Sequence, residues 1–344
     1  MRSDDLTPVN TGNMINPRLF EHYQIDTKKD LAIAARCARP FDTLLIDRWG
    51  SCFVCECQAW LPQSVGNLHR NTIPEILNGA LTKEMRKSVS DGTYRYCNSN
   101  QCLYIKKGDI HPVTHGKALQ HLRLAIDDSC NLSCPSCRNT QIFLKSGKMF
   151  DMRMRLVDKL LEFLRQRTDP LKIHIGSDGD PFASLIYRRF MRQVPDLDNL
   201  SYSFQTNGLL VKQMYPRVRN IFEKLHTLNV SIDGASRDTY EALRRGGTWK
   251  KIRENLEFIG QLKHRHGFKL VLHMVVQRQN WHEMLDMCDL GSGLGADEVV
   301  LNKIEDWQTF GDFDKHRVPD SDEVSDLLEK VDAHPLSITW SYLQ

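Results

Sequence analysis

Three cysteines within residues 130–137 place the strongest constraint on what this chain can fold into. Cys130, Cys134 and Cys137 form a Cys-x3-Cys-x2-Cys loop directly after the apolar segment Leu122–Ile126, which is predicted to be a strand. Three thiolates on one short loop can ligate three irons of a [4Fe–4S] cube and leave the fourth iron open to a small chelating ligand. A structural zinc loop is the alternative, but it normally closes with four ligands, and the nearest histidine, His121, lies at the far end of the strand.

Composition narrows the class of protein further. The 344 residues are 41% hydrophobic and 26% charged, as in ordinary globular proteins, and the net charge of +3 is too small to indicate nucleic-acid binding. No apolar run approaches the ~18–20 residues that span a bilayer, and the N-terminus lacks the apolar core of a signal peptide. We therefore expect a cytoplasmic protein with no membrane or nucleic-acid partner, whose ten cysteines are metal ligands rather than disulfides.

Strands and helices alternate from about residue 117 onward, which predicts parallel βαβ units. The predicted strands are Leu122–Ile126, Leu171–Ile175, Leu200–Phe204, Val230–Ile232, Leu270–Val276 and Val299–Leu301. Six strands with intervening helices, among them Tyr215–Leu225, favour an α/β fold with a partial, TIM-like (β/α)6 barrel; a doubly wound sheet is the competing topology. In such barrels the active residues lie at the carboxyl ends of the strands.

The N-terminal third is rich in cysteine and poor in long helices. Thr43–Ile46 and Cys52–Cys57 predict the two strands of a hairpin that turns near Arg48-Trp49-Gly50. On a strand, Cys55 and Cys57 would face one side and Cys52 the other. The predicted divisions are a polar arm (1–29), a cysteine-rich module (30–110), the barrel (117–310) and a tail (311–344). A zinc-ribbon-like module that binds a partner is the alternative for residues 30–110.

The strand ends resemble the radical S-adenosylmethionine (SAM) superfamily. Asp178-Gly179-Asp180-Pro181 stands after the second strand, where that family has a GGEP-like segment. The third strand ends in Thr206-Asn207-Gly208, the fourth in Ser231-Ile-Asp233-Gly234 followed by Arg244-Arg-Gly-Gly247, and the fifth at Gln277. The resemblance covers roughly residues 117–310. It implies a [4Fe–4S] cluster on Cys130, Cys134 and Cys137 that cleaves bound SAM reductively and yields a 5′-deoxyadenosyl radical.

The same resemblance implies a set of SAM contacts. The backbone of Asp178, Gly179, Asp180 and Pro181 is expected to meet the amino group of SAM, and Ser231 and Asp233 to lie near its ribose and methionine parts. Asn207 and Gln277 complete the expected cofactor-binding set. Two features depart from the family: Ser136 replaces an aromatic residue, and Asp178 and Asp180 replace the first Gly and the Glu of GGEP. An Asx-rich turn is the alternative for the two aspartates.

The N-terminal cysteines resemble the SPASM and twitch modules that hold auxiliary [4Fe–4S] clusters. This resemblance rests on two spacings, Cys37-x12-Gly50-x4-Cys55 and Cys97-x4-Cys102. In relatives the module usually follows the barrel, whereas here it precedes the barrel. The implied ligands of one auxiliary cluster are Cys37, Cys55, Cys97 and Cys102, and Cys57 is the main rival.

These resemblances imply hydrogen abstraction from a substrate, with an external electron donor such as flavodoxin or ferredoxin. We expect net oxidation or bond formation on a small polar, sugar-containing or peptide substrate; the 29-residue arm is too short for a peptide-leader domain. A redox-neutral epimerase with a cysteine hydrogen donor is the alternative, although Cys288 falls in an outer helix and fits a core role. An iron–sulfur or zinc-binding regulatory protein is the non-enzyme alternative. Further candidate substrate contacts are Asp127, Asp128, His174, Asn302, Lys303 and Glu305.

Overall fold

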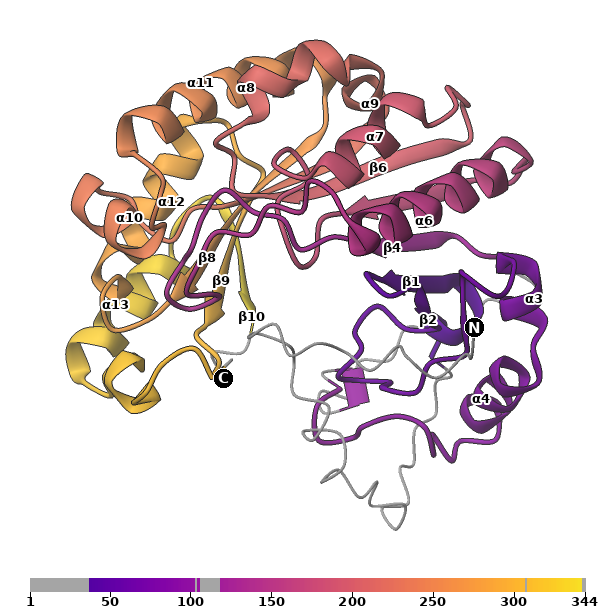
Figure 1. Ribbon diagram of the computed structural model, residues 1–344. Helices are drawn as coiled ribbons and strands as arrows, with labels where there is room; N and C mark the ends of the chain where they lie inside the picture. The colour runs from indigo at the N-terminus through magenta and orange to yellow at the C-terminus, as the bar shows by residue number, and fades with distance from the viewer. Residues whose placement is uncertain (1–36, 103, 106–117, 307, 342–344) are drawn as a thin grey trace.

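One open sheet organises the part of the chain that the computed structural model describes, which is residues 37–102, 104–105, 118–306 and 308–341. The predicted polar arm, 1–29, lies outside these residues. The described strands form a ten-stranded sheet in the order β10-β9-β8-β7-β6-β5-β4-β1-β2-β3 (Figure 1). The fold is therefore α/β with one continuous sheet.

Seven neighbouring strands of this sheet are parallel and follow the order of the chain. They are β4 (His121–Ala125), β5 (Leu171–Ile175), β6 (Leu200–Thr206), β7 (Leu225–Ser231), β8 (Lys269–Val276), β9 (Glu298–Lys303) and β10 (Ser337–Ser341). A doubly wound sheet would reverse its strand order at a switch point. The unbroken order confirms the predicted partial barrel, to which β10 adds a strand.

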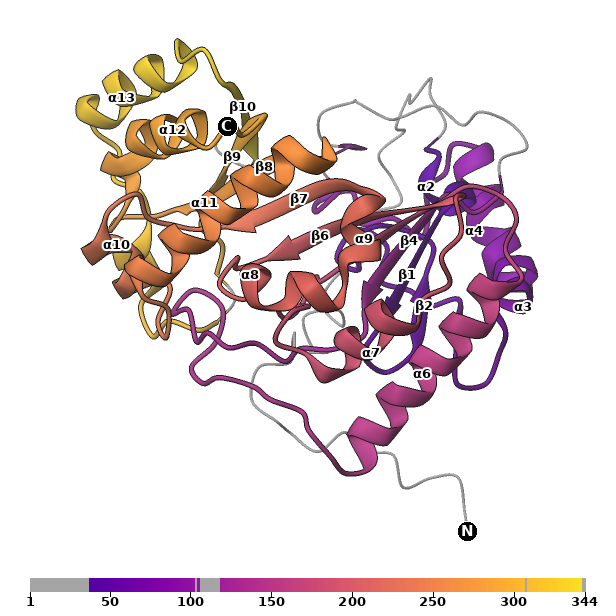
Figure 2. The same cartoon turned by 90° about the horizontal axis from the view of Figure 1, so that it is seen from above.

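Helices of the barrel lie along one face of its sheet (Figures 1 and 2). The helices of the barrel and tail are α6 (Lys148–Arg165), α7 (Leu185–Gln193), α8 (Val211–Met214), α9 (Arg219–Glu223), α10 (Arg237–Leu243), α11 (Trp249–His266), α12 (Met284–Gly293) and α13 (Asp322–Asp332). Along β6, Tyr202 and Phe204 are buried, while Ser201, Ser203 and Gln205 are half-buried. Because side chains alternate along a strand, the polar set lies on the face without helices, here called the concave face.

The predicted helix Tyr215–Leu225 is wrong in its extent. The chain forms a 3-10 turn at Tyr215–Arg217 and the short α9, and Leu225 begins β7. Pro216 cannot donate a helical hydrogen bond, which limits the helix on this side. Strand β7 consequently starts five residues before the predicted Val230.

The cysteine-rich module extends the same sheet. It contains α2 (Arg39–Asp42), β1 (Thr43–Asp47), β2 (Ser51–Phe53), β3 (Gly66–Asn67), α3 (Ile73–Asn78) and α4 (Ala80–Ser90). Strands β1 and β2 form the predicted antiparallel hairpin, and β1 also pairs in parallel with β4. However, β2 ends at Phe53, so the argument that Cys55 and Cys57 share one side of a strand is wrong.

No helix in the described part of the chain is both long and apolar enough to cross a membrane.

Candidate active site

The three-cysteine loop leaves the carboxyl end of β4 and is closed by backbone pairing. Cys130 and Ile142 exchange two backbone hydrogen bonds, with N–O distances of 2.8 and 3.3 Å. Within the loop, the N–H groups of Cys137 and Arg138 both donate to the carbonyl of Cys134 at 2.9 Å. All three cysteines are free of disulfides. The backbone thus shapes the loop without using its thiols.

Two guanidinium groups approach the thiols of this loop. Arg138 Nε donates to Cys137 Sγ at 3.4 Å, and Arg244 Nη1 donates to Cys134 Sγ at 3.8 Å. Arg244 is held by an ion pair with Asp233 at 2.9 Å. Positive charge and N–H donors stabilise thiolate sulfur, so this surrounding suits ligands that carry negative charge.

The donor set fits an iron–sulfur cube. Burial raises the pKa of the Cys130 thiol to about 12, so ligation of a metal must displace its proton. Among the described residues, no three Cys, His, Asp or Glu side chains gather closely enough to hold a single metal ion. A cube binds each thiolate to a different iron atom, so its ligands surround a cluster rather than one point.

The segment after β5 is packed tightly against the cysteine loop. A Cβ on Gly179 would lie 2.5 Å from the carbonyl oxygen of Ser129, a distance that only glycine avoids. The next residue, Asp180, donates its backbone N–H to the same carbonyl at 2.9 Å. The predicted cradle 178–181 therefore lies beside the thiol loop.

The carboxylate of Asp180 is used within the protein. One oxygen accepts two backbone N–H groups of its own turn, at 3.0 and 3.1 Å. The other accepts from Thr206 Oγ1 at 2.7 Å and from Asn207 N at 2.8 Å, at the end of β6. This is the Asx-type turn that the sequence left open. The groups of this segment that remain for a ligand are backbone groups and the exposed Asp178.

The remaining predicted SAM contacts stand at the same edge of the sheet. Asn207 Nδ2 lies 3.8 Å from Cys130 Sγ. Asp233, with a left-handed φ of 61°, accepts from Val275 N at 2.7 Å, and Gln277 is buried beside it at the end of β8. Because β4–β8 are parallel, their carboxyl ends form one rim, which collects all the strand-end motifs.

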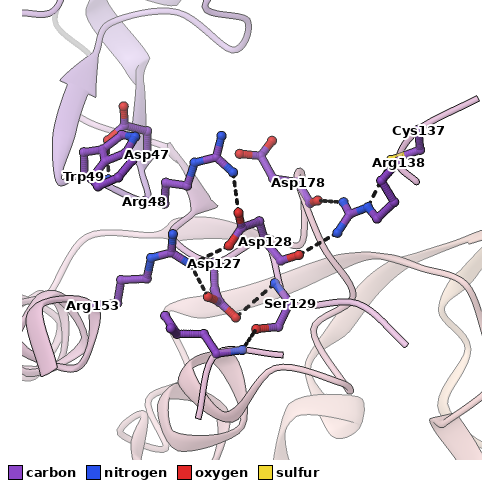
Figure 3. Close-up of polar contacts among 11 residues, drawn as sticks. Asp47, Arg48, Trp49, Asp127, Asp128, Ser129, Cys137, Arg138, Arg153 and Asp178 are labelled. Carbon is purple, nitrogen blue, oxygen red and sulfur yellow. Dashed lines mark hydrogen bonds and ion pairs between the residues drawn. The ribbon is translucent and has the colours of Figure 1, made fainter. Parts of the chain in front are cut away.

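An ion-pair network beneath the cysteine loop was not predicted from the sequence (Figure 3). Arg153 of α6 contacts Asp127 and Asp128, each at 2.5 Å. Arg48, from the β1–β2 turn of the module, contacts Asp128 at 2.7 Å. Asp127 and Asp128 were candidate substrate contacts, but their carboxylates are paired. Asp128 instead joins the module to the cluster loop, whereas Asp127 pairs with Arg153 of α6.

The four predicted auxiliary-cluster ligands lie near one another around Tyr94. Burial, together with the neighbouring thiol of Cys102, raises the pKa of Cys37 to about 11. Burial likewise raises the pKa of Cys97, to which the thiols of Cys37 and Cys102 contribute. The pKa of the buried Cys55 is raised in the same way, with contributions from Cys97 and Cys37. Both Cys37 and Cys97 also pack against Tyr94.

The other three cysteines are not among the predicted cluster ligands, and the backbone of one of them, Cys57, contacts the thiol of Cys55. Cys52 is fully buried, and its thiol contacts the carbonyl of Gly50. Burial raises the pKa of the Cys57 thiol, and the positive charge of Arg123 lowers it by a smaller amount. Cys288 is fully buried in α12, on the helical side of the sheet.

The concave face below the rim carries polar side chains in hydrogen-bonded pairs. His174 and Ser203 are 3.0 Å apart, and His273 and Asn229 are 3.1 Å apart. Arg123 stands next to His174 across the β4–β5 pairing. Nearer the rim, Gln205 donates to Ser231 at 2.6 Å, and Asn302 is half-buried, while Lys303 and Glu305 are exposed. A polar face on a parallel sheet is suited to hold a polar ligand.

An open parallel barrel with a three-thiol loop at its carboxyl rim defines a cofactor-dependent α/β enzyme whose metal centre leaves one position open. The model of the radical SAM superfamily matches residues 126–291, and that of the SPASM iron–sulfur cluster-binding domain matches residues 37–103. The chain belongs to the radical SAM superfamily and carries its SPASM module on the N-terminal side. It therefore binds SAM and [4Fe–4S] clusters.

Curated relatives match the chain over part of its length. The GTP 3′,8-cyclase of Synechocystis sp. is 24% identical over 180 residues, 51% of this chain and 51% of the relative. That of Lactiplantibacillus plantarum is 26% identical over 200 residues, 55% and 57% of the two chains. The chain thus spans about half the length of these relatives.

Solved structures resemble it more distantly. Streptococcus suis SuiB bound to SAM has a TM-score of 0.44 and 12% identity, and the alignment covers 78% of this chain and 58% of SuiB. A radical SAM methyltransferase from Sphaerobacter thermophilus has a TM-score of 0.41 and 15% identity, over 62% and 63% of the two chains.

Proposed function

We propose that the chain cleaves SAM reductively at a cluster on Cys130, Cys134 and Cys137 and oxidises a polar substrate held on the concave face. When bound, this cluster supplies the electron that converts SAM into methionine and a 5′-deoxyadenosyl radical. The residues of the chain hold and orient the participants. Arg138 and Arg244 keep positive charge beside the thiolates, at 3.4 and 3.8 Å from the sulfurs.

The SAM cradle is proposed at the rim. Gly179 lets the backbone of residues 178–181 approach the thiol loop, so that backbone groups can meet the amino group of SAM. Asp180 positions this segment through its four hydrogen bonds rather than by touching SAM. Ser231, Asn207 and Gln277 provide the neutral polar groups of the same rim, and Asp233 holds Arg244 in place.

Net oxidation rests on one observation: four thiols of the module lie close together. Cys37, Cys55, Cys97 and Cys102 suffice to ligate every iron of a cube, which leaves no open iron for a substrate. Such a cluster suits electron acceptance. Strand pairing of β1 with β4 places its module at the edge of the barrel sheet, next to the concave face. An external donor of the flavodoxin or ferredoxin type would supply the first electron.

Epimerisation is a second candidate, because Cys57 is not needed as a ligand of the proposed auxiliary cluster and its thiol could donate hydrogen. A substrate radical that takes hydrogen from the Cys57 thiol would keep its oxidation state. The curated relatives are named GTP 3′,8-cyclases, and bond formation within a substrate is likewise compatible with the proposed radical chemistry. A small polar molecule or a peptide is the proposed substrate class.

Anaerobic reconstitution followed by reaction with SAM and dithionite tests the core of the proposal. The unmodified chain should form 5′-deoxyadenosine, detected by chromatography, and Cys130→Ala, Cys134→Ala and Cys137→Ala should not. Cys288→Ala is the matched control, because it removes a buried thiol on the helical side and should retain activity. Equal activity in the three loop variants and the control would overturn the assignment.

Deuterated water distinguishes the two reaction types once a substrate is available. Oxidation predicts no deuterium at the reacting carbon of the product. Deuterium at that carbon without a change of oxidation state would show that an exchangeable thiol returns the hydrogen, and Cys57→Ala should then abolish the incorporation.

A further inference from the structure

Arg123 lies on the concave face, and its guanidinium has no hydrogen-bond or ion-pair partner among the described residues. Its neighbours across the strand pairing are Leu45 on β1 and His174 on β5. Within the described residues it forms no hydrogen bond or ion pair, and its Nε is buried without an acceptor. A largely buried cation without a compensating anion is unfavourable, so the site is incomplete as it stands.

The carboxylates of Glu56, beside Arg123, and of Glu298, on the distant strand β9 of the same face, are committed elsewhere. Glu56 pairs with Arg39 at 3.3 Å and accepts from Tyr104 at 2.7 Å. Glu298, higher on the same face, pairs with Lys269 at 2.5 Å. Neither forms an ion pair with Arg123 in the described structure. The positive charge of Arg123 is therefore available to a ligand.

Beside Arg123 lie the paired carboxylate of Glu56, the thiols of Cys55 and Cys57 and, across the β4–β5 pairing, His174. Burial lowers the pKa of His174 to about 3, and the charge of Arg123 adds to this effect, so the imidazole is neutral at pH 7. It keeps a hydrogen-bonding nitrogen besides the one that meets Ser203. Lys172, two residues before His174 and on the same face, is exposed and forms no ion pair in the described structure.

We infer that Arg123, His174 and Lys172 form an anion-binding subsite that takes a carboxylate or phosphate group of the substrate. The inference deepens the proposed function, since it assigns a charge to the molecule held on the concave face. Arg123 offers a planar fork of N–H donors that matches both anions, and His174 adds a neutral donor. The subsite lies on the strand interiors, below the rim that holds SAM, so the anion would anchor one end of the substrate and direct another part toward the radical.

Thermal unfolding of the reconstituted protein, under anaerobic conditions and without SAM, tests this subsite. The probes are ~50 mM inorganic phosphate and ~50 mM acetate, each compared with chloride at equal ionic strength. For a dissociation constant of about 5 mM, Tm should rise by about 2 °C with at least one probe. The larger rise identifies a phosphoryl or a carboxylate ligand.

Arg123→Met should abolish the rise, and in chloride its Tm should be no lower than that of the unmodified chain, because an unpaired buried charge has been removed. Arg123→Lys should keep a smaller rise. Arg237→Gln, which removes an exposed arginine of α10, should leave the rise unchanged.

No rise with either probe, or a rise that persists in Arg123→Met, would overturn the inference. If neither anion stabilises the protein and Arg123→Met lowers the midpoint potential of the auxiliary cluster, the charge serves that cluster instead. Formation of 5′-deoxyadenosine by the unmodified chain uses no added anion. Failure of that reaction would therefore count against the proposed function separately from this subsite.

Discussion

Arg153 should be the most sensitive point of the ion-pair network beneath the cluster loop (Figure 3). Its side chain is 5% exposed, and it contacts Asp127, which is fully buried, and Asp128. In Arg153→Met the carboxylate of Asp127 would keep only one weak donor, the N–H of Ser129 at 3.3 Å. Removing one partner of a buried pair typically costs about 3–5 kcal/mol, which corresponds to a fall in Tm of roughly 5 °C for a chain of this length.

Arg48→Met is the matched control. Arg48 and Asp128 are 17% and 19% exposed, so solvent screens their interaction, and Asp128 would still be paired with Arg153. The expected cost is about 1 kcal/mol or less, a fall in Tm of roughly 1 °C. Anaerobic scanning fluorimetry of the reconstituted proteins, with iron and sulfide contents measured in parallel, gives both numbers.

A double variant separates charge burial from loss of packing. Arg153→Met combined with Asp127→Asn should recover much of the lost stability, because the buried group left behind is then neutral. Equal falls in Tm for the two arginine variants, or no recovery in the double variant, would refute the reasoning.

Three further predictions concern the cradle, the module and pH. Gly179→Ala should weaken SAM binding by more than about tenfold in equilibrium titration, because its Cβ would lie 2.5 Å from the Ser129 carbonyl oxygen and must displace the segment; a Kd like that of the unmodified chain would contradict the tight fit. Reconstituted protein should contain about eight irons and eight sulfides per chain, and a variant that lacks Cys130, Cys134 and Cys137 should contain about half as many. Adding Cys97→Ala to that variant should remove the remaining iron and sulfide, whereas adding Cys57→Ala should not. Burial raises the pKa of Asp47 to about 6, so stability should fall as pH rises from about 4 to 6; Asp47→Asn should flatten this dependence in denaturant titrations, and an unchanged slope would disprove the assignment.

Local sequence patterns predicted the parallel strands and the motifs that follow them. Alternating apolar strands and amphipathic helices located the barrel, and the order of strands then brings residues 130–137, 178–181, 207, 231–233 and 277 to one rim. The prediction failed where local signals compete. Pro216 interrupts an apolar stretch that otherwise fits a helix, and β2 ends at Phe53 although Cys55 and Cys57 continue its alternating pattern.

The roles of individual polar residues depended on contacts between distant segments. For Asp180 the sequence left a SAM cradle and an Asx-rich turn as alternatives, and its hydrogen bonds to Thr206 and Asn207 turn its carboxylate inward. Asp127 and Asp128 were predicted near the barrel mouth as substrate contacts. In the structure, ion pairs with Arg153, and for Asp128 also with Arg48, compensate their charges. No periodic pattern in the sequence predicts such contacts between distant segments.

The cofactors of the chain could be predicted from its residues, because thiol spacing and glycine placement are local requirements of the cofactors. Only the tertiary structure could show the concave face and show that Arg123 has no partner there among the described residues. Strand register sets His174 beside Arg123, and pairing of β1 with β4 brings the module to the edge of the same sheet. The physical reason is that charge compensation and burial are properties of a surrounding, and that surrounding is assembled from strands far apart in the sequence.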